Sequence, residues 1–192
     1  MTDLTGFTFG RGGSFWSPFM HVTEFNHPIT RCIPQDLFWG TTRSIAPIFH
    51  MADPDATILG EVVYGLGRCQ PGLGIKQVQP AASAQPWNSV YVATPNLPPQ
   101  ILRGIARHAG VHLYNEDGDV LYATPELLAV HTVSGGPRTF KLPARAEVVF
   151  DLYRNQLLER DAAQFCVDLP PASTALYYTG PANKLNMLKT KP

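Results

Sequence analysis

The chain has 192 residues, 44% of them hydrophobic, and its acidic and basic side chains balance to no net charge at neutral pH. This length corresponds to one large or two small domains with enough apolar residues to bury a core. The absence of a basic excess argues against binding to nucleic acid or to an anionic membrane. Eighteen prolines and 16 glycines separate short apolar runs, which favours short strands and many turns.

The three cysteines, Cys32, Cys69 and Cys166, lie far apart and lack the spacing of metal ligands. A disulfide framework is therefore not expected. No apolar run reaches the roughly 18 residues of a membrane span, so no membrane segment is predicted. The first six residues lack the basic and apolar regions of a signal peptide, and this predicts a cytoplasmic location.

The first 20 residues are rich in glycine and phenylalanine, with a glycine-rich run at residues 10–13. Such a run cradles a phosphate when it joins a strand to a helix. Here Pro18 and several aromatic residues follow instead of a helical pattern, so we interpret the segment as a surface loop. Residues 65–67 fail the same test, and the sequence predicts no bound cofactor.

Two loops carry the residues best suited to metal binding or to acid–base catalysis. The candidates are His21, Glu24 and His27 in the first loop, and His50, Asp53 and Asp55 in the second. Three ligands in the first loop would need a shared helical face, which the proline after His27 disfavours. The Asp-Pro-Asp run at 53–55 is a turn initiator, so a structural role is favoured there. The sequence thus identifies no catalytic residue, and a small metal- or acid/base-dependent hydrolase stays a less favoured alternative.

Residues 87–114 predict a buried strand, a loop, a helix and a further strand. Val90, Tyr91 and Val92 are β-formers in an apolar run. The Pro98-Pro99 pair suits a first helical turn, and Gly110 suits the residue after a helix. With strands at 56–64 and 74–78, the pattern predicts a partial α/β layer over residues 1–110.

Beyond residue 110 the apolar pattern alternates with a period of two. Turn signals occur at 115–119 and 134–137, and short strands are predicted at 111–114, 120–123, 127–133, 138–142, 147–152, 157–159, 164–168 and 174–178. Strands at this spacing predict a small antiparallel β-sandwich over residues 111–182. Residues 183–192 are predicted to be a flexible tail. The fold class predicted for the whole chain is α+β and strand-rich.

Four segments of the first 110 residues form a recognisable series: His27-Pro28-Ile29-Thr30 followed by Pro34, Ala56-Thr57-Ile58-Leu59-Gly60, Val90-Tyr91-Val92, and the helix at 102–110. The series resembles the later part of an α/β domain related to class I glutamine amidotransferases. That domain occurs as the trimerisation-type domain of bacterial β-galactosidases and related glycoside hydrolases. Residues 169–177 are similar to the closing strand of the β-domain that ends many such enzymes. The resemblance implies a flavodoxin- or amidotransferase-like layer before a C-terminal β-domain.

The chain departs from both chemistries that the resemblance suggests. Amidotransferases carry their nucleophile on a Gly-x-Cys-x-Gly elbow, and none of the three cysteines is flanked in this way. A retaining glycosidase places two carboxylates about 5 Å apart, and this chain is too short to hold a barrel beside these domains. We therefore expect a fragment of a longer chain: a non-catalytic accessory region that associates with an upstream catalytic domain or forms a homo-oligomer.

Exposed aromatic residues offer an alternative function as a carbohydrate-binding module. The candidates are Trp16, Trp39 and Trp87. Aromatic faces stack on the apolar faces of sugars, but the same residues also anchor cores and interfaces. Carbohydrate binding requires that two or three of them be coplanar and exposed.

Overall fold

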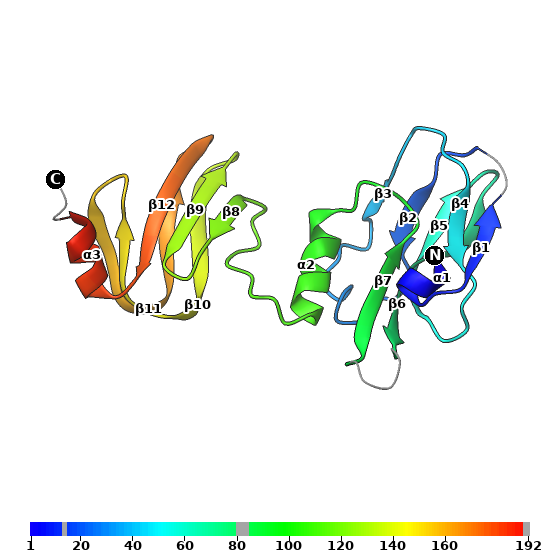
Figure 1. Ribbon diagram of the computed structural model, residues 1–192. Helices are drawn as coiled ribbons and strands as arrows, with labels where there is room; N and C mark the ends of the chain where they lie inside the picture. Colours follow the sequence, from blue (N-terminus) through cyan, green and yellow to red (C-terminus); the bar gives the residue numbers. More distant parts are fainter. Residues whose placement is uncertain (13–14, 80–84, 190–192) are drawn as a thin grey trace. The chain divides into compact units, whose positions relative to one another are not determined.

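The computed structural model describes residues 1–12, 15–79 and 85–189, which form two compact units, Met1–Gly110 and Val111–Pro192 (Figure 1). Strands predominate in both units, and each unit has its own hydrophobic core. Within the described ranges, no helix is long and apolar enough to cross a membrane.

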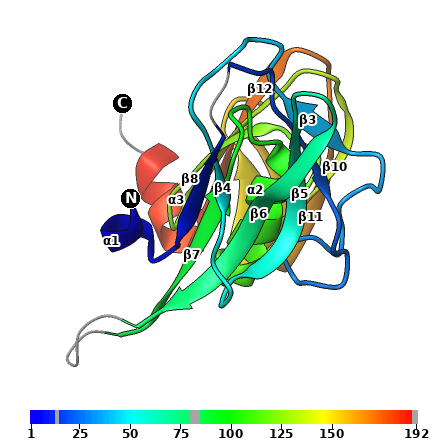
Figure 2. The ribbon, with the colours of Figure 1, turned by 90° about the vertical axis from the view of Figure 1, so that its right-hand side faces the viewer.

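The first unit contains a two-stranded sheet, a five-stranded sheet and two helices. Its elements are α1 (Thr2–Thr5), β1 (Phe9–Gly12), β2 (Phe19–Val22), β3 (Phe38–Gly40), β4 (Ile48–Met51), β5 (Thr57–Tyr64), β6 (Arg68–Val78), β7 (Trp87–Val92) and α2 (Pro99–His108). Strand β1 pairs with β4, and the larger sheet has the order β3-β2-β5-β6-β7. Figure 2 shows β6 and β7 running together as a long twisted ribbon.

The prediction of an amidotransferase-like layer needs correction, because every described strand pair of the larger sheet is antiparallel. Amidotransferase-like layers are built on parallel strands, and parallel neighbours need a crossover of about a dozen residues or more. Only residues 65–67 separate β5 from β6, with Gly65 and Gly67 at φ 63° and 76°. This connection is long enough for a hairpin alone, so the first unit is an antiparallel sheet with one substantial helix.

Helix α2 forms where the proline pair and the later glycine predict it. Pro98 stands before the helix, Pro99 occupies its first turn, and Gly110 follows it at φ 72°. Ile101 is fully buried in the core of the first unit. Gly104 lies so close to the preceding loop that an added Cβ atom would be 2.0 Å from the carbonyl oxygen of Ile29. Helix α2 therefore packs directly on the backbone of the loop at Ile29.

The second unit contains β8 (Val120–Ala123), β9 (Leu127–Thr132), β10 (Gly136–Asp151), β11 (Gln156–Leu169), β12 (Ser173–Gly180) and α3 (Ala182–Lys189). All five strands belong to one antiparallel sheet of order β11-β10-β12-β9-β8. Residues 111–114, predicted as a strand, form none, and the four segments predicted between 138 and 168 merge into two long strands.

The long β10–β11 hairpin folds this single sheet over itself. The β10–β11 ladder shifts register between Lys141 and Ala146. The part of the hairpin that contains Phe140 and Phe165 then packs on residues of β12 and β9 in one core. The Phe165 and Tyr177 rings are 5.0 Å apart between centroids, and the Phe140 ring lies 6.1 Å from Tyr177. The second unit is thus a β-sandwich-like arrangement made from one folded five-stranded sheet.

The flexible tail predicted for residues 183–192 is corrected in part. Helix α3 continues to Lys189, and Leu185 is only 5% exposed. Leu185 packs in a small cluster with Val148, Phe150 and Tyr178. These partners come from β10 and β12, and so the local sequence around residue 185 gave no signal of burial.

We expect Gly104→Ala to destabilise the first unit. Alanine is the better helix former by about 1 kcal/mol, but the added methyl group would overlap the Ile29 carbonyl. Overpacking of this kind should lower the free energy of unfolding by about 2 kcal/mol. All three tryptophans precede residue 110, so tryptophan fluorescence during urea denaturation reports on this unit.

Leu102→Ala is the matched control in the same helix, because Leu102 is 52% exposed. It should change the free energy of unfolding by no more than about 0.5 kcal/mol. A stabilising Gly104→Ala substitution would show that the helix is not seated on this loop.

Candidate functional site

The three candidates of the first loop do not converge on a common point. His21 lies in β2, with its Nε2 atom 4.0 Å from the Glu61 carboxylate. The Glu24 carboxylate accepts the Asn26 N–H at 2.6 Å. The Nδ1 atom of His27 accepts the Ile29 N–H at 3.2 Å. Each side chain therefore has its own local partner.

Asp53 in the second loop is buried in a structural cluster. Its carboxylate accepts the backbone N–H groups of Thr8 and Asp55, and Lys76 Nζ lies 2.9 Å from both oxygens. Burial alone raises the pKa of Asp53, but the hydrogen bonds from Lys76 and Thr8 outweigh it and hold the pKa below its usual range. Asp53 thus stays ionised and ties the loop to β6.

His50 is packed against the neighbouring strand instead of facing Asp53. A Cβ atom on Gly10 would lie 2.2 Å from His50 Nε2, so the imidazole covers this glycine in the β1–β4 ladder. Its Nδ1 atom is buried without a hydrogen-bond partner among the described residues. Across the described ranges, no group of three or more His, Cys, Asp or Glu side chains could hold a metal ion.

The three tryptophans lie in different surroundings. Trp39 is 6% exposed and belongs to the core, so it presents no face to a ligand. Trp16 is 37% exposed, bridges to Ile45 and lies against Gly65. Trp87 is 44% exposed and begins β7, at the opposite edge of the sheet from the strand that carries Trp39.

A different aromatic pair occupies the outer face of the same sheet. Phe38 is 55% exposed, and its ring stacks on Phe19 with centroids 5.3 Å apart and planes 5° apart. The His21 ring lies 6.2 Å from Phe38, and Glu61 is its neighbour on β5. Alternation of side chains along β3 could have predicted that Phe38 is exposed, because neighbouring residues of a strand face opposite sides and Trp39 faces the core.

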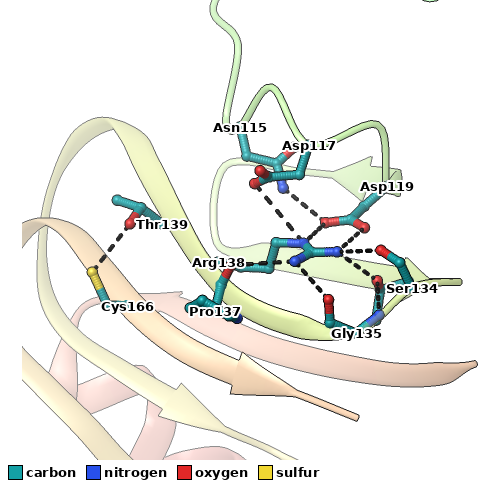
Figure 3. Close-up of polar contacts among 10 residues, drawn as sticks. Asn115, Asp117, Asp119, Ser134, Gly135, Pro137, Arg138, Thr139 and Cys166 are labelled. Atoms are coloured by element: carbon teal, nitrogen blue, oxygen red, sulfur yellow. Dashed lines mark hydrogen bonds and ion pairs between the residues drawn. The ribbon is translucent and has the colours of Figure 1, made fainter. Parts of the chain in front are cut away.

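The densest polar cluster of the second unit surrounds Arg138 on β10 (Figure 3). Its guanidinium donates from Nε to Asp119 at 2.8 Å and from Nη1 to the carbonyl oxygen of Gly135 at 2.9 Å. Its Nη2 atom donates to Thr132 and Ser134, each at 3.0 Å. The cluster therefore joins the loop before β8 to the β9–β10 turn.

Charge and burial give this cluster a structural character. The side chains of Arg138 and Asp119 are 7% and 4% exposed. Burial raises the pKa of Asp119, but hydrogen bonds, chiefly from Arg138, more than offset this and hold the pKa below its usual range. The Asp119 hydrogen bond is also the main reason that the pKa of Arg138 is raised. The Nε, Nη1 and Nη2 atoms of Arg138 all donate hydrogen bonds within the cluster, as expected of a buried structural guanidinium.

The sequence around Arg138 contains a signal for the burial of its side chain. Arg138, Phe140 and Leu142 alternate along β10 and are all buried. A charge in line with an apolar stripe needs an internal partner, because an unpaired buried charge is costly. Asp117 and Asp119 in the preceding turn were the candidates for that partner.

The fold is similar to part of known bacterial glycoside hydrolases. A β-galactosidase from Bacillus circulans sp. alkalophilus matches with a TM-score of 0.52 and 14% sequence identity, over 93% of this chain and 25% of that one. A β-galactosidase from Rahnella sp. R3 matches with a TM-score of 0.48 and 11% identity, over 88% of this chain and 24% of that one. No family model and no curated protein matches the sequence. The chain thus spans about a quarter of the length of these two enzymes, and the likeness concerns the fold.

We expect Arg138→Met to destabilise the second unit strongly. The substitution leaves Asp119 buried without its cation, which typically costs about 3–5 kcal/mol. Denaturation should be followed by circular dichroism, since the second unit contains no tryptophan. The tryptophan fluorescence transition of the first unit should stay in place.

Arg145→Met is the matched control. The Arg145–Asp161 pair is 60% and 80% exposed, so its loss should cost less than about 1 kcal/mol. Equal effects of the two substitutions would refute the structural role given to the Arg138 cluster.

Proposed function

We propose that this chain is a non-catalytic accessory region of a glycoside hydrolase-like protein of the β-galactosidase type. The observation that carries the proposal is the fold likeness, which extends over 93% of this chain but only 25% of the Bacillus circulans enzyme. A match of this extent fits a region that accompanies a catalytic domain. The antiparallel first unit does not support the amidotransferase-like part of the expectation, and that part is not carried further.

The buried carboxylates support a structural role. Glycoside hydrolysis needs a carboxylic acid whose pKa is raised, so that it can protonate the leaving group. The pKa values of Asp53 and Asp119 are both held low by their cation partners. Asp151 accepts the backbone N–H groups of Tyr153 and Arg154 and so fixes the β10–β11 turn. All three acids stabilise loops, and the lowered pKa values make Asp53 and Asp119 poorly suited to donate a proton.

The edge strand β8 supports an association role. Val120 is 49% exposed and Tyr122 is 75% exposed, and β8 is the last strand of its sheet. Edge strands with apolar side chains and free backbone groups favour pairing with another chain. We propose a second copy as the partner, because antiparallel β8 strands related by a two-fold axis would extend both sheets symmetrically.

We expect the chain to self-associate through β8, and Tyr122→Lys to weaken this association. A lysine adds a charge to the apolar edge and repels its symmetry mate. Sedimentation velocity over a wide concentration range should show a dimer for the wild-type chain and a monomer for the variant. Leu66→Lys is the control, since Leu66 is 96% exposed in the β5–β6 turn of the other unit.

The same samples should be assayed with a chromogenic β-galactoside, and we expect no hydrolysis above the buffer rate. A wild-type chain that sediments as a monomer at every concentration would remove the association role. Hydrolysis by the purified chain would overturn the accessory reading altogether.

The Phe19–Phe38 pair favours carbohydrate binding as a second candidate function. An exposed ring beside a His21–Glu61 pair combines a stacking face with hydrogen-bonding groups. Sugars are commonly held by this combination of an apolar face and nearby polar groups. The pair offers a stacking face in addition to the exposed Trp16 and Trp87, whereas Trp39 is buried.

If this second function is correct, galacto-oligosaccharides should bind with an affinity that Phe38→Ala lowers. Loss of about 1 kcal/mol of stacking would raise the Kd roughly fivefold in isothermal titration calorimetry. Phe15→Ala is the control, because Phe15 is 74% exposed and not part of the pair. An absence of binding, or an equal loss in both variants, would argue against this function.

A further inference from the structure

Two histidines face one another where α2 is seated on the loop between β2 and β3. The ring centroids of His27 and His108 are 5.4 Å apart, and the rings are tilted by 44°. His27 begins the turn at residues 27–30, and His108 is the last residue of α2. Both side chains are half-buried. A change of charge on His27 therefore acts where α2 contacts the loop between β2 and β3.

The turn beneath the helix depends on the neutral form of His27. Thr30 and Arg31 each donate a backbone N–H to the His27 carbonyl at 2.9 Å. The Ile29 N–H donates to the His27 ring at Nδ1, 3.2 Å away. A neutral imidazole can accept at Nδ1 when its proton is on Nε2, whereas a protonated ring is a donor at both nitrogens. Protonation of His27 therefore removes this hydrogen bond.

The same turn is the surface that α2 touches most closely. The Ile29 carbonyl oxygen would be 2.0 Å from a Cβ atom on Gly104, and Ile29 and Ile101 are both fully buried in one core cluster. A shift of the turn cannot be absorbed by an intervening side chain, because backbone packs on backbone at Gly104. Loosening of residues 27–30 must therefore loosen the helix.

The surrounding groups set how readily His27 takes up a proton. Burial and the neighbouring His108 lower the pKa of His27, while Glu24 on its own loop acts in the opposite direction. Asn88 of β7 lies 3.4 Å from His108 Nε2 and carries no charge. Arg31 on the loop and Arg103 and Arg107 on α2 are permanent cations, so their charges do not change in the range where histidine titrates.

We propose that the His27–His108 pair is an acid-sensitive latch that holds α2 on the 27–30 turn. The latch is closed while the His27 ring is neutral and accepts the Ile29 N–H at Nδ1, above the ordinary histidine pKa of about 6.5. Below that pH the unfolded or opened chain binds more protons than the closed one, so the stability of the closed state falls as the pH falls. Acid then opens α2 by breaking the Ile29 hydrogen bond and by placing a positive charge on His27 beside the His108 ring, 5.4 Å away between centroids.

The test is native-state hydrogen exchange of the α2 amides in the full chain between about pH 7.5 and pH 5, corrected for intrinsic exchange rates. In the wild-type chain the opening constant of α2 should rise on acidification by up to about tenfold per pH unit, the limit for one proton taken up. His27→Asn should abolish most of this rise. The asparagine side chain can still accept the Ile29 N–H in an Asx-turn, but it does not titrate.

Two further variants keep the test decisive. His108→Gln removes the ring that lowers the pKa of His27 and should reduce the rise even if His27→Asn is poorly folded. His131→Gln is the control, because His131 lies in β9 of the other unit and pairs with Thr174. An unchanged pH dependence in both His27→Asn and His108→Gln, or a wild-type helix indifferent to pH, would overturn the proposal.

Discussion

Short connections between strands are the constraint on which the rest of this structure depends. Three residues join β5 to β6, three join β8 to β9 and four join β10 to β11, and each of these strand pairs is antiparallel. Connections of this length return the chain beside itself and permit only antiparallel neighbours. Asn155 has a positive φ angle of 52° in the β10–β11 turn, as a tight reversal of the chain requires. These turns set the antiparallel pairing of the strands that they join.

Paired buried charges then fix the loops that the sheets leave open. Lys76 and Asp53 hold the loop before β5 to β6, while Arg138 and Asp119 hold the loop before β8 to the start of β10. In each case a strand supplies the cation and a loop supplies the carboxylate. Asp53, which the sequence offers as a candidate for metal binding or catalysis, is thus part of an ion pair that fixes a loop. It also fits an accessory region whose surfaces, more than its pockets, would carry the function.

The local signals of the sequence were sufficient for some elements and insufficient for others. Helix α2 was predictable because Pro98, Pro99 and Gly110 mark its ends within a few residues. The amidotransferase-like layer was not confirmed, because it came from a resemblance of short segments, whereas the three-residue link between β5 and β6 forms a hairpin. The long strand β10 was divided in prediction at Pro143, which lies at the register shift where no ladder hydrogen bond is needed.

The functional candidates depended on contacts between distant segments, and this limited what the sequence could predict. Trp39 was nominated for its residue type, but its neighbours on β2 and β5 bury it. The stacking of Phe19 on Phe38 joins two strands that are separated by an irregular loop, and no local pattern encodes their register. Leu185 is buried by residues at least seven positions away in the chain. The contacts of Trp39 and Phe38 follow from strand pairing, which single-sequence patterns specify weakly, and that of Leu185 follows from packing of α3 on the sheet.

The bent β10–β11 hairpin has a consequence for how the second unit resists force and heat. Strands β10 and β11 contribute to both layers of the folded sheet, so neither layer can separate without disrupting the β10–β11 pairing. Loss of the Phe140–Phe165–Tyr177 contact would release the arm and the body of the same ribbon together. The second unit should therefore unfold cooperatively in a single step, under force as well as on heating.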